Sequence, residues 1–583
     1  MNLTTQETSA GVETLAERLQ AHAAADPRGD AFIHLKDGET ESRRMSWHQL
    51  DLGARSVAAR LVGRHAPGER ALLLYRAGLD FVVAFLGCLY ARVIPVAAPA
   101  DMLGRRGRTL AHLLAVFHDA KPSVVLSTGE LLATIAGLAG HAPGLLDIAQ
   151  LDTTTIEPET GAGWRPGHEA AGGIAYLQYS SGSTAAPKGV AIGQYQLVNM
   201  LDMLTQAYGY DSRSSFVCWM PHYHDYGLVQ GLLHPIHAGI PCIVMSPVSF
   251  VQRPVRWLAA LTRYRVTHSA GPNFAYDQCL RKVTQEQCVG LDLSAWRMAA
   301  SGAEPIRQGT VWAFAEKFAP FGFRGDSFYP SYGLAEATLI VSGPKRVATP
   351  PFLPLRAGAL ERGRVEIAGE GEAGVRHIAG CGAAGAGVVI RIVNPDSRTA
   401  AAPGEVGEVW AASKALALGY WQRPEETRDI FDARIADTGE GPFLRTGDLG
   451  FLEDGELYIV GRRKDLIILS GANHHPEEIE WTVEGSHPQV RQGSAAAFTI
   501  DDDDGSHLVV LVEVSPSRVA DPADRSAVIR SIRKAVALEH GLHVDRLILL
   551  GPGAVEKTTS GKIQRAACRA ALLAGRLSVL QEG

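Results

Sequence analysis

The sequence predicts an α/β fold in two parts, a large N-terminal region of layered α/β subdomains and a small α+β region after it. Short strand-like runs alternate with helical stretches through most of the chain, and the clearest of these runs are residues 124–128, 173–179, 242–246 and 388–393. Strands interleaved with helices form layers with partly parallel sheets. After residues 461–471 the pattern changes to one strand-like run at 507–514 and one helix that ends near Gly541. We therefore expect two domains, residues 1–463 and residues 464–583.

Length and composition limit the class of protein. The chain has 583 residues, of which 46% are hydrophobic, and a formal net charge of −6. These values are typical of a globular protein with several domain-sized units, and they exclude a generally basic surface for nucleic acid. The most apolar run, residues 81–90, is far shorter than the ~20 residues of a membrane-spanning helix. We expect a buried helix there and no membrane span.

The cysteines and the N-terminus indicate a cytoplasmic protein. Seven cysteines are an odd number, and no two of them form a C-x-x-C pair. This pattern predicts reduced, mostly buried thiols in place of a disulfide framework or a zinc site. Val12, Leu15 and Leu19 have the spacing of an amphipathic helix, and no basic stretch followed by an apolar run precedes them.

The segment SSGSTAAPKGV, residues 180–190, is the strongest local signal of a phosphate site. Small residues let backbone N–H groups approach phosphate oxygens, and Lys188 adds a positive charge. The spacing is not that of a Walker loop. Taken alone, such a segment is more often a flexible loop, and its neighbours in the sequence decide between the two interpretations.

A proline-, glycine- and alanine-rich region at residues 343–387 interrupts the α/β pattern. One interpretation is a long surface loop. The apolar residues Phe352, Leu353 and Leu355 favour the other interpretation, in which the region packs against the rest of the protein.

Four further motifs follow the 180–190 segment in a fixed order. They are SYGLAEAT (331–338), RTGDLG (445–450), GRRKDLI (461–467) and KTTSGKIQR (557–565). With these motifs the chain resembles, over nearly its whole length, the adenylate-forming superfamily of acyl-CoA synthetases, peptide-synthetase adenylation domains and luciferases. It resembles most closely the fatty acyl-AMP ligases, the branch that serves polyketide and lipopeptide assembly. The segments that carry this closer resemblance are residues 71–96, 219–233, 301–306 and 471–480, together with an insertion at about 344–386.

The resemblance implies that residues 1–463 form an adenylation domain, that residues 464–583 form a mobile domain hinged at Lys464, and that ATP binds between them. Tyr332 would stack on the adenine, Asp448 would accept hydrogen bonds from the ribose hydroxyls, and Arg462 would bind ribose or phosphate. The full set of implied ATP-binding residues is Ser181, Gly182, Ser183, Thr184, Lys188, Gly302, Ala303, Glu304, Tyr332, Gly333, Asp448, Arg462 and Lys557.

Three residues have catalytic roles by the same resemblance. Lys562 would supply the key positive charge in adenylation, Glu336 would bind Mg²⁺, and His224 would lie beside the carboxylate of the substrate. Isolated lysines and carboxylates of this kind are usually solvated, so these roles depend on the motifs. The implied acyl pocket consists of Met220, Asp225, Gly227, Leu228, Gly231, Phe250 and Asn273, although each of these could equally be an ordinary core residue.

The implied function is activation of a medium- or long-chain fatty acid by ATP and Mg²⁺ to acyl-AMP, with release of pyrophosphate. The acyl group would then pass to the phosphopantetheine thiol of an acyl carrier protein on a separate chain, and the enzyme would be a monomer or weak dimer. The insertion would disfavour the arrangement that accepts coenzyme A. Two alternatives remain open, a long-chain fatty acyl-CoA synthetase and a catalytically silent acyl- or nucleotide-binding regulatory homologue. The sequence does not indicate the chain length or substituents of the acid, or the identity of the carrier.

Overall fold

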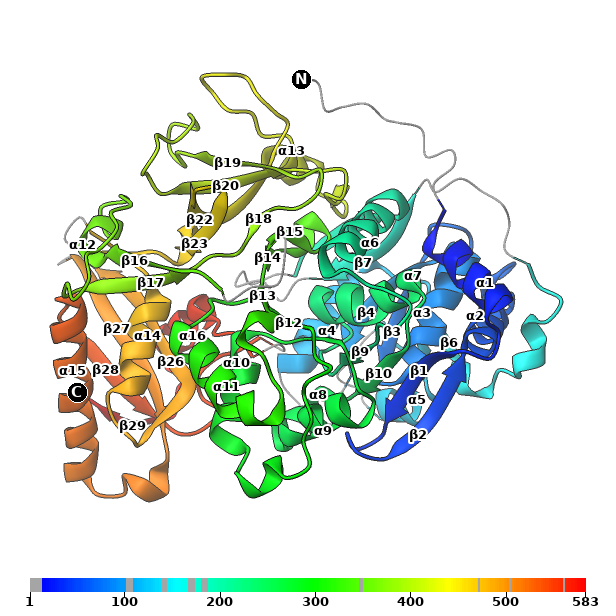
Figure 1. Ribbon diagram of the computed structural model, residues 1–583, viewed down its shortest axis with the longest axis horizontal. Helices are drawn as coiled ribbons and strands as arrows, with labels where there is room; N and C mark the ends of the chain where they lie inside the picture. The colour runs from blue at the N-terminus through cyan, green and yellow to red at the C-terminus, as the bar shows by residue number, and fades with distance from the viewer. Residues whose placement is uncertain are drawn as a thin grey trace.

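The computed structural model describes residues 13–100, 108–137, 144–165, 173–179, 187–344, 350–469, 472–502, 505–558 and 561–583. Four of the predicted site residues, Ser181, Gly182, Ser183 and Thr184, lie outside the described residues. The predicted α/β class is confirmed, because helices and largely parallel sheets alternate through the N-terminal region (Figure 1).

Two seven-stranded sheets form the centre of the N-terminal region. In the first, only the edge pair β1–β2 is antiparallel. Its strands, in spatial order, are β13 (Phe328–Pro330), β12 (Met298–Ser301), β11 (His268–Ala270), β9 (Phe216–Cys218), β10 (Cys242–Met245), β1 (Asp30–Leu35) and β2 (Glu41–Ser46). In the second, β8 pairs antiparallel with both of its neighbours and the remaining pairs are parallel. Its strands are β21 (Gly419–Tyr420), β8 (Gly189–Gly193), β7 (Ile174–Tyr179), β4 (Ile94–Pro99), β3 (Arg70–Tyr75), β5 (Val124–Ser127) and β6 (Ala149–Asp152).

Helices pack against these sheets because their apolar residues recur at helical spacing. The predicted helix at 81–90 is part of α3 (Leu79–Ala91), most of whose residues are buried, and the predicted N-terminal helix is α1 (Leu15–Ala25), capped by Thr14. The other helices of the region are α2 (Trp47–Leu61), α4 (Arg108–Ala120), α5 (Gly129–Ala136), α6 (Gln194–Tyr208), α7 (His234–Ala238), α8 (Pro247–Gln252), α9 (Val255–Arg263), α10 (Asn273–Lys282) and α11 (Gln308–Phe318).

A third, antiparallel sheet lies at the top of the view in Figure 1, above the C-terminal lobe. Its strands are β19 (Val389–Val393), β20 (Gly407–Ala412), β22 (Leu444–Glu453) and β23 (Glu456–Arg462), and α13 (Pro424–Phe431) packs beside it. The register of the β22–β23 pair places Asp448 directly opposite Arg462. The hairpin therefore brings together two residues that are predicted to bind the nucleotide.

The C-terminal lobe has its own sheet and its own buried clusters. The predicted strand at 507–514 is part of β27, and the predicted helix is α15, which ends at Gly541 in the left-handed conformation. The elements of the lobe are β24 (Ile467–Leu469), β25 (Ala472–His474), α14 (Pro476–Gly485), β26 (Val490–Asp502), β27 (Gly505–Val514), α15 (Pro522–His540), β28 (Arg546–Leu550), α16 (Arg565–Leu573) and β29 (Val579–Glu582).

Residues 343–387, for which the sequence left open a surface loop or a docked segment, pack against the rest of the protein wherever the structure describes them. It forms the β16–β17 ribbon and a short helix, and β18 adds to the β14–β15 pair. Leu355 and Leu360 are buried in one cluster with Phe451 and Tyr458 of the third sheet. The elements here are β14 (Tyr332–Gly333), β15 (Ile340–Gly343), β16 (Phe352–Arg356), α12 (Ala357–Leu360), β17 (Val375–Ala379) and β18 (Ala383–Ala384).

Composition predicted buried, reduced thiols and no membrane-spanning helix. All seven cysteines are buried and unbridged. Across the residues that the structure describes, no helix combines the length and the apolar character that crossing a membrane requires.

Replacing Leu355 with alanine tests how firmly the insertion is docked. Removing this fully buried side chain leaves a cavity beside Phe451 and Tyr458, and such a change costs about 2–5 kcal/mol. We expect the ribbon to open locally and to be cleaved faster by a protease of broad specificity, with cleavage sites mapped by mass spectrometry. Leu538→Ala, at a side chain that is 75% exposed, is the matched control and should leave the cleavage rate within about twofold. Equal cleavage rates in the two variants would contradict the docking.

Candidate active site

A cleft of about 1980 Å³ lies where the N-terminal region meets the C-terminal lobe, and residues of both parts line it. The predicted site residues in its wall are Lys188, Met220, His224, Asp225, Asn273, Gly302, Ala303, Glu304, Tyr332, Gly333, Glu336, Asp448, Arg462, Lys464, Lys557 and Lys562. The fold thus gathers into one cavity residues that are more than 350 positions apart in the sequence.

Asp448 is the centre of a buried polar group on the wall formed by the third sheet. Its Oδ1 is 2.9 Å from Nε of Arg462, and its Oδ2 accepts a hydrogen bond of 2.7 Å from the hydroxyl of Tyr332. The attraction of Asp448 is the main cause that raises the pKa of Arg462, and burial raises the pKa of Tyr332 well above its ordinary value. These two contacts hold the Asp448 side chain in place, and its oxygens can accept further hydrogen bonds.

Close backbone contacts shape the wall next to Tyr332. A Cβ atom at Gly333 would come within 1.8 Å of the carbonyl oxygen of Leu339, and one at Gly302 within 2.8 Å of the carbonyl oxygen of Ser331. Only glycine fits where two chain segments approach this closely. Ala303, between Gly302 and Glu304, has a φ of 67°, the left-handed conformation that non-glycine residues rarely adopt.

Glu304 is held by the backbone of α10. Its Oε1 accepts a hydrogen bond of 2.6 Å from the N–H of Phe274, while burial raises the pKa of the carboxyl. Asn273, one residue earlier, uses its Oδ1 to accept a hydrogen bond of 3.0 Å from the N–H of Arg307. Both side chains therefore stabilise this part of the wall as well as lining it.

His224 and Asp225 precede a π-helix, η4 (Tyr226–Leu233). Nδ1 of His224 is 2.5 Å from Oδ1 of Asp225, which also accepts a hydrogen bond of 2.8 Å from the N–H of Tyr226. Burial acts to raise the pKa of Asp225, but His224, Lys562 and the N–H of Tyr226 together hold it below its usual value. π-helices are rare and occur frequently at functional sites.

Glu336 and Lys188 are joined through residues that the sequence interpretation missed. The hydroxyl of Tyr420 donates a hydrogen bond of 2.9 Å to Glu336, and the ammonium of Lys188 lies 5.4 Å from the centre of the Tyr420 ring. Lys188 also forms an ion pair with Glu426. Neither Tyr420 nor Glu426 carries a local motif. Tyr420 is placed by the pairing of β21 with β8, and Glu426 is placed by α13, which packs against β21.

The wall fits a divalent cation held jointly with phosphates. Glu336 offers one half-buried carboxylate to the cleft, and Mg²⁺ is commonly bound by one or two carboxylates together with substrate phosphates. Among the residues that the structure describes, no group of three or more His, Cys, Asp or Glu side chains could hold a metal ion by itself.

Lys562 reaches this wall from the C-terminal lobe. Burial is the main cause that lowers the pKa of its amine, and Arg462 lowers it further, whereas Asp225, Glu304 and Asp448 raise it. Those carboxylates belong to the N-terminal region, so the amine lies within their field across the cleft. Within the described part of the chain, no side chain pairs with this amine at hydrogen-bond or ion-pair distance.

Two other predicted lysines of the lobe are placed differently. The amine of Lys557 donates a hydrogen bond of 3.0 Å to Oγ of Ser494, so it is held within the lobe and not directed at the N-terminal wall. Lys464 lies in the short turn Arg463–Asp465 that joins the two parts, where burial lowers the pKa of its amine.

Four of the seven predicted acyl-pocket residues lie behind the wall. Gly227, Leu228, Gly231 and Phe250 do not line the described cleft. A Cβ at Gly227 would meet the carbonyl oxygen of Pro221 at 2.1 Å, and one at Gly231 would meet Sγ of Cys218 at 2.3 Å. Leu228 and Phe250 are buried core residues, and Phe250 stacks on Trp219 with ring centres 4.0 Å apart. For these residues the structure shows packing that supports the wall, and their contact with an acyl chain stays a prediction.

The arrangement suits a polyanion bound beside a planar, hydrogen-bonding group. Lys188, Arg462, Lys464 and Lys562 bring four positive charges to one cavity, while Asp448 provides a fixed acceptor. The His224–Asp225 pair lines the same cleft together with the largely apolar side chains of Met220 and Trp219. The cleft can therefore hold a charged group and an apolar group at the same time.

Comparisons with known proteins identify the family. Residues 19–421 match the family described as AMP-binding enzyme, and residues 464–582 match the one described as Disco-interacting protein 2-like, AMP domain. The chain is 45% identical to the medium-chain-fatty-acid–[acyl-carrier-protein] ligase JamA of Moorena producens, over 97% of this chain and 96% of the relative. It is 36% identical to the long-chain-fatty-acid–AMP ligase FadD26 of Mycobacterium marinum, over 94% of this chain and 95% of the relative.

The fold is shared with solved structures of the same class. One is a fatty acyl-adenylate ligase from L. pneumophila in complex with acyl adenylate and pyrophosphate, with a TM-score of 0.76 and 36% identity over 99% of this chain and 98% of that one. Family match, relatives and fold agree with the resemblance in the motifs. The chain belongs to the AMP-binding, adenylate-forming enzymes and, within them, to the fatty acyl-AMP ligases.

Proposed function

We propose that this enzyme uses ATP to convert a medium- or long-chain fatty acid to acyl-AMP, releases pyrophosphate, and transfers the acyl group to the phosphopantetheine thiol of an acyl carrier protein. The observation that carries the proposal is the position of Lys562, which the C-terminal lobe brings to a cleft lined by Tyr332, Asp448 and Arg462. The names of JamA and FadD26 support the same two half-reactions.

The first half-reaction needs charge neutralisation more than proton transfer. A fatty acid has a carboxyl pKa of about 4 to 4.5, like a glutamate side chain, so it is already ionised at neutral pH. The obstacle is the approach of this anion to the α-phosphorus of a polyanion. Lys562, Lys188 and Arg462 lower that obstacle by holding positive charge in a partly desolvated cleft, and His224 positions the carboxylate.

Glu336 would hold Mg²⁺, which supplies charge neutralisation on the phosphates when it is bound. Tyr420 donates to one oxygen of this carboxylate and so fixes its orientation. We also infer that the enzyme is cytoplasmic and acts as a monomer or weak dimer, and the seven buried, unbridged thiols support that location.

Lys562→Ala is expected to reduce adenylation by about 10²–10³-fold, because a contact of this type stabilises charge that develops in the transition state. Release of pyrophosphate with added fatty acid measures the effect. Lys534→Ala, an exposed lysine on α15 of the same lobe, is the matched control and should keep the wild-type rate. A Lys562→Ala variant that retained near-normal pyrophosphate release would reject the assignment. Release that depends on added acid in the wild-type enzyme would also exclude a catalytically silent homologue.

Glu336→Gln is expected to raise the Mg²⁺ concentration that gives half-maximal adenylation by about tenfold or more, since the amide keeps the shape but loses the charge of the ligand. Titration of pyrophosphate release with Mg²⁺ checks this. Glu425→Gln, on the neighbouring helix α13 outside the cleft wall, is the control. An unchanged titration curve for Glu336→Gln would assign the metal to other groups.

The second half-reaction requires that the lobe withdraw Lys562 and open a path for a thiol. We propose that the lobe swings at Lys464 and that the insertion restrains this swing. The support comes from direct contacts between the insertion and the C-terminal lobe, at α14 and β25. Nη1 of Arg376 lies 2.5 Å from Oε2 of Glu478, with both side chains nearly buried, and the carbonyl oxygen of Glu361 accepts a hydrogen bond of 2.9 Å from the N–H of Asn473.

A second contact joins the lobe to the N-terminal region outside the insertion. The guanidinium of Arg307 lies 4.4 Å from the ring centre of Trp481 and 4.0 Å from Glu484. A swing has to break both the Arg376 and the Arg307 contacts, and a buried charge that loses its partner is costly. The restraint disfavours arrangements that a free thiol such as coenzyme A needs, whereas a carrier protein can offset the cost with contacts of its own.

Arg376→Ala is expected to raise acyl-CoA formation several-fold while adenylation stays within about threefold of wild type, because a population shift of tenfold needs only about 1.4 kcal/mol. Incubation with ATP, fatty acid and coenzyme A, followed by mass spectrometry of thioesters, measures it. Arg356→Ala removes an exposed arginine of the same insertion, whose ion pairs to Glu366 and Glu372 stay within the insertion.

The same incubation with the wild-type enzyme distinguishes the carrier-dependent ligase from the alternative, a long-chain fatty acyl-CoA synthetase. Rapid formation of a coenzyme A thioester without any carrier would favour the acyl-CoA synthetase. Accumulated acyl-AMP that coenzyme A does not consume supports the carrier-dependent ligase. Identical behaviour of Arg376→Ala and Arg356→Ala would show that the Arg376–Glu478 contact does not restrain the lobe.

A further inference from the structure

The π-helix η4 carries buried polar atoms in the cleft wall that have no hydrogen-bond partner among the residues that the structure describes. Gln230 is fully buried, and within the described ranges neither its amide oxygen nor its amide nitrogen has a partner. The hydroxyl of Tyr226, a residue that is 7% exposed, also has no partner in the described part of the chain. Both residues line the cleft. The question is what these donors and acceptors are for.

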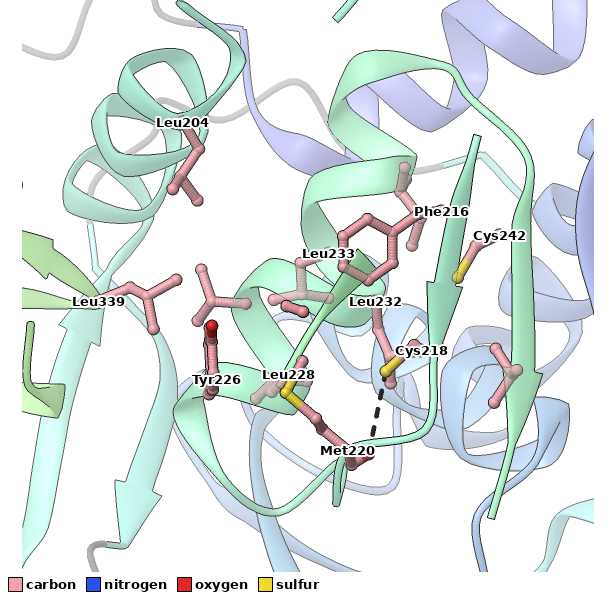
Figure 2. Packing of buried hydrophobic residues seen from close by; sticks show 14 of the residues in the cluster. Leu204, Phe216, Cys218, Met220, Tyr226, Leu228, Leu232, Leu233, Cys242 and Leu339 are labelled. Carbon is pink, nitrogen blue, oxygen red and sulfur yellow. Dashed lines mark hydrogen bonds between the residues drawn. The ribbon is translucent and has the colours of Figure 1, made fainter. Parts of the chain in front are cut away.

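The two residues lie on the π-helix that follows the His224–Asp225 pair. Four positions separate Tyr226 from Gln230, close to one turn of a helix with i→i+5 hydrogen bonds, so both can serve the same face. Figure 2 shows the Tyr226 side chain standing apart from Leu228, Leu232 and Leu233, on the side of the helix that faces Leu339. Leu339 lines the cleft as well. The polar atoms of Tyr226 and Gln230 therefore line the cleft together with the apolar side chain of Leu339.

A plain hydrocarbon chain would leave these atoms unsatisfied. Leaving a buried amide without a partner weakens ligand binding by about 10- to 100-fold relative to a ligand that pairs with it. Unpaired groups of this kind are rare in folded proteins. An apolar residue of the same size would pack at position 230 without that cost. The presence of an amide is therefore unfavourable unless the ligand itself completes the hydrogen bonds.

We propose that the acyl chamber recognises a fatty acid that carries a hydroxyl group along its chain, and that Gln230 and Tyr226 bind this hydroxyl. The proposal rests on the proposed function and names its substrate class. A hydroxyl can donate to Oε1 of Gln230 and accept from Nε2 of Gln230 or from Tyr226, so it satisfies donors and acceptors together. An oxo group could only accept, and it would leave Oε1 unpaired.

The direct test compares acids that differ only in the hydroxyl. Octanoic and decanoic acids are each offered beside the set of their hydroxylated positional isomers, and the acyl-adenylates are quantified by mass spectrometry. We expect one position to be preferred over the plain acid by at least about tenfold in kcat/KM. Preference for the plain acid over every isomer overturns the proposal but leaves the proposed function intact. Failure to adenylate any acid overturns both.

Variants show whether the named side chains carry the preference. Gln230→Leu keeps the side-chain size and removes the amide, and Tyr226→Phe removes only the hydroxyl; both should reduce the ratio of kcat/KM for hydroxylated over plain acid by about 10- to 100-fold. Tyr210→Phe is the matched control, because the Tyr210 hydroxyl is also buried and has no partner among the described residues but does not line the cleft. The ratio is measured within each variant, so a general loss of folded enzyme does not change it. A ratio that Gln230→Leu leaves at the wild-type value means that the amide serves only a trapped water, and it overturns the proposal.

Discussion

The position of the Lys562 amine is the constraint on which the rest of the site depends. Burial and the neighbouring Arg462 both act against its positive charge, and three carboxylates across the cleft act in favour of it. All three carboxylates already have other partners: Asp225 contacts His224, Asp448 contacts Arg462, and Glu304 accepts a hydrogen bond from the N–H of Phe274. The amine is thus a cation whose compensation is incomplete, and a partly buried charge in that state is costly until an anion arrives. In the proposed function this cost favours the binding of a polyphosphate, because the charge is in place before the substrate binds.

Such a cation cannot hold the lobe in place by itself, so other contacts must do so. Within the lobe, Arg565 binds Glu480 through two hydrogen bonds of 2.7 and 2.8 Å and also pairs with Asp465 and Glu477. Arg565 begins α16 three residues after Lys562, and Asp465 belongs to the turn that joins the two parts. This paired guanidinium therefore ties the Lys562 segment to the proposed hinge, and the segment follows any rotation there as a rigid unit. The Arg376 and Arg307 contacts then set the resting orientation of that unit.

The sequence predicted what depends on local pattern, and it missed what depends on the meeting of distant segments. The strands at 174–179 and 242–245, the helix ending at His540 and the charged residues of the motifs follow from spacing that can be read along the chain. Tyr420, which fixes Glu336, and Arg376, which contacts Glu478, lie 84 and 102 positions from their partners and carry no motif. Gln230 was missed for a different reason. In sequence it is one polar residue in an apolar run, and it becomes informative only because it is buried with no partner in the part of the chain that the structure describes.

Lys562 belongs to the C-terminal lobe, whereas Tyr332 and Asp448 belong to the N-terminal region, and this division affects the direction of the proposed reaction. A charge that stabilises the adenylation transition state accelerates the forward and the reverse reaction alike, so its withdrawal after pyrophosphate leaves would slow the return to ATP. In the proposed cycle only the lobe moves, and Tyr332 and Asp448 remain to hold the nucleotide half of the product. Gln230 and Tyr226 would hold the acyl half in the same part of the protein. The mixed anhydride between the two halves then keeps its position while the lobe exchanges a lysine for a thiol, which is the condition for transfer without loss of the intermediate to water.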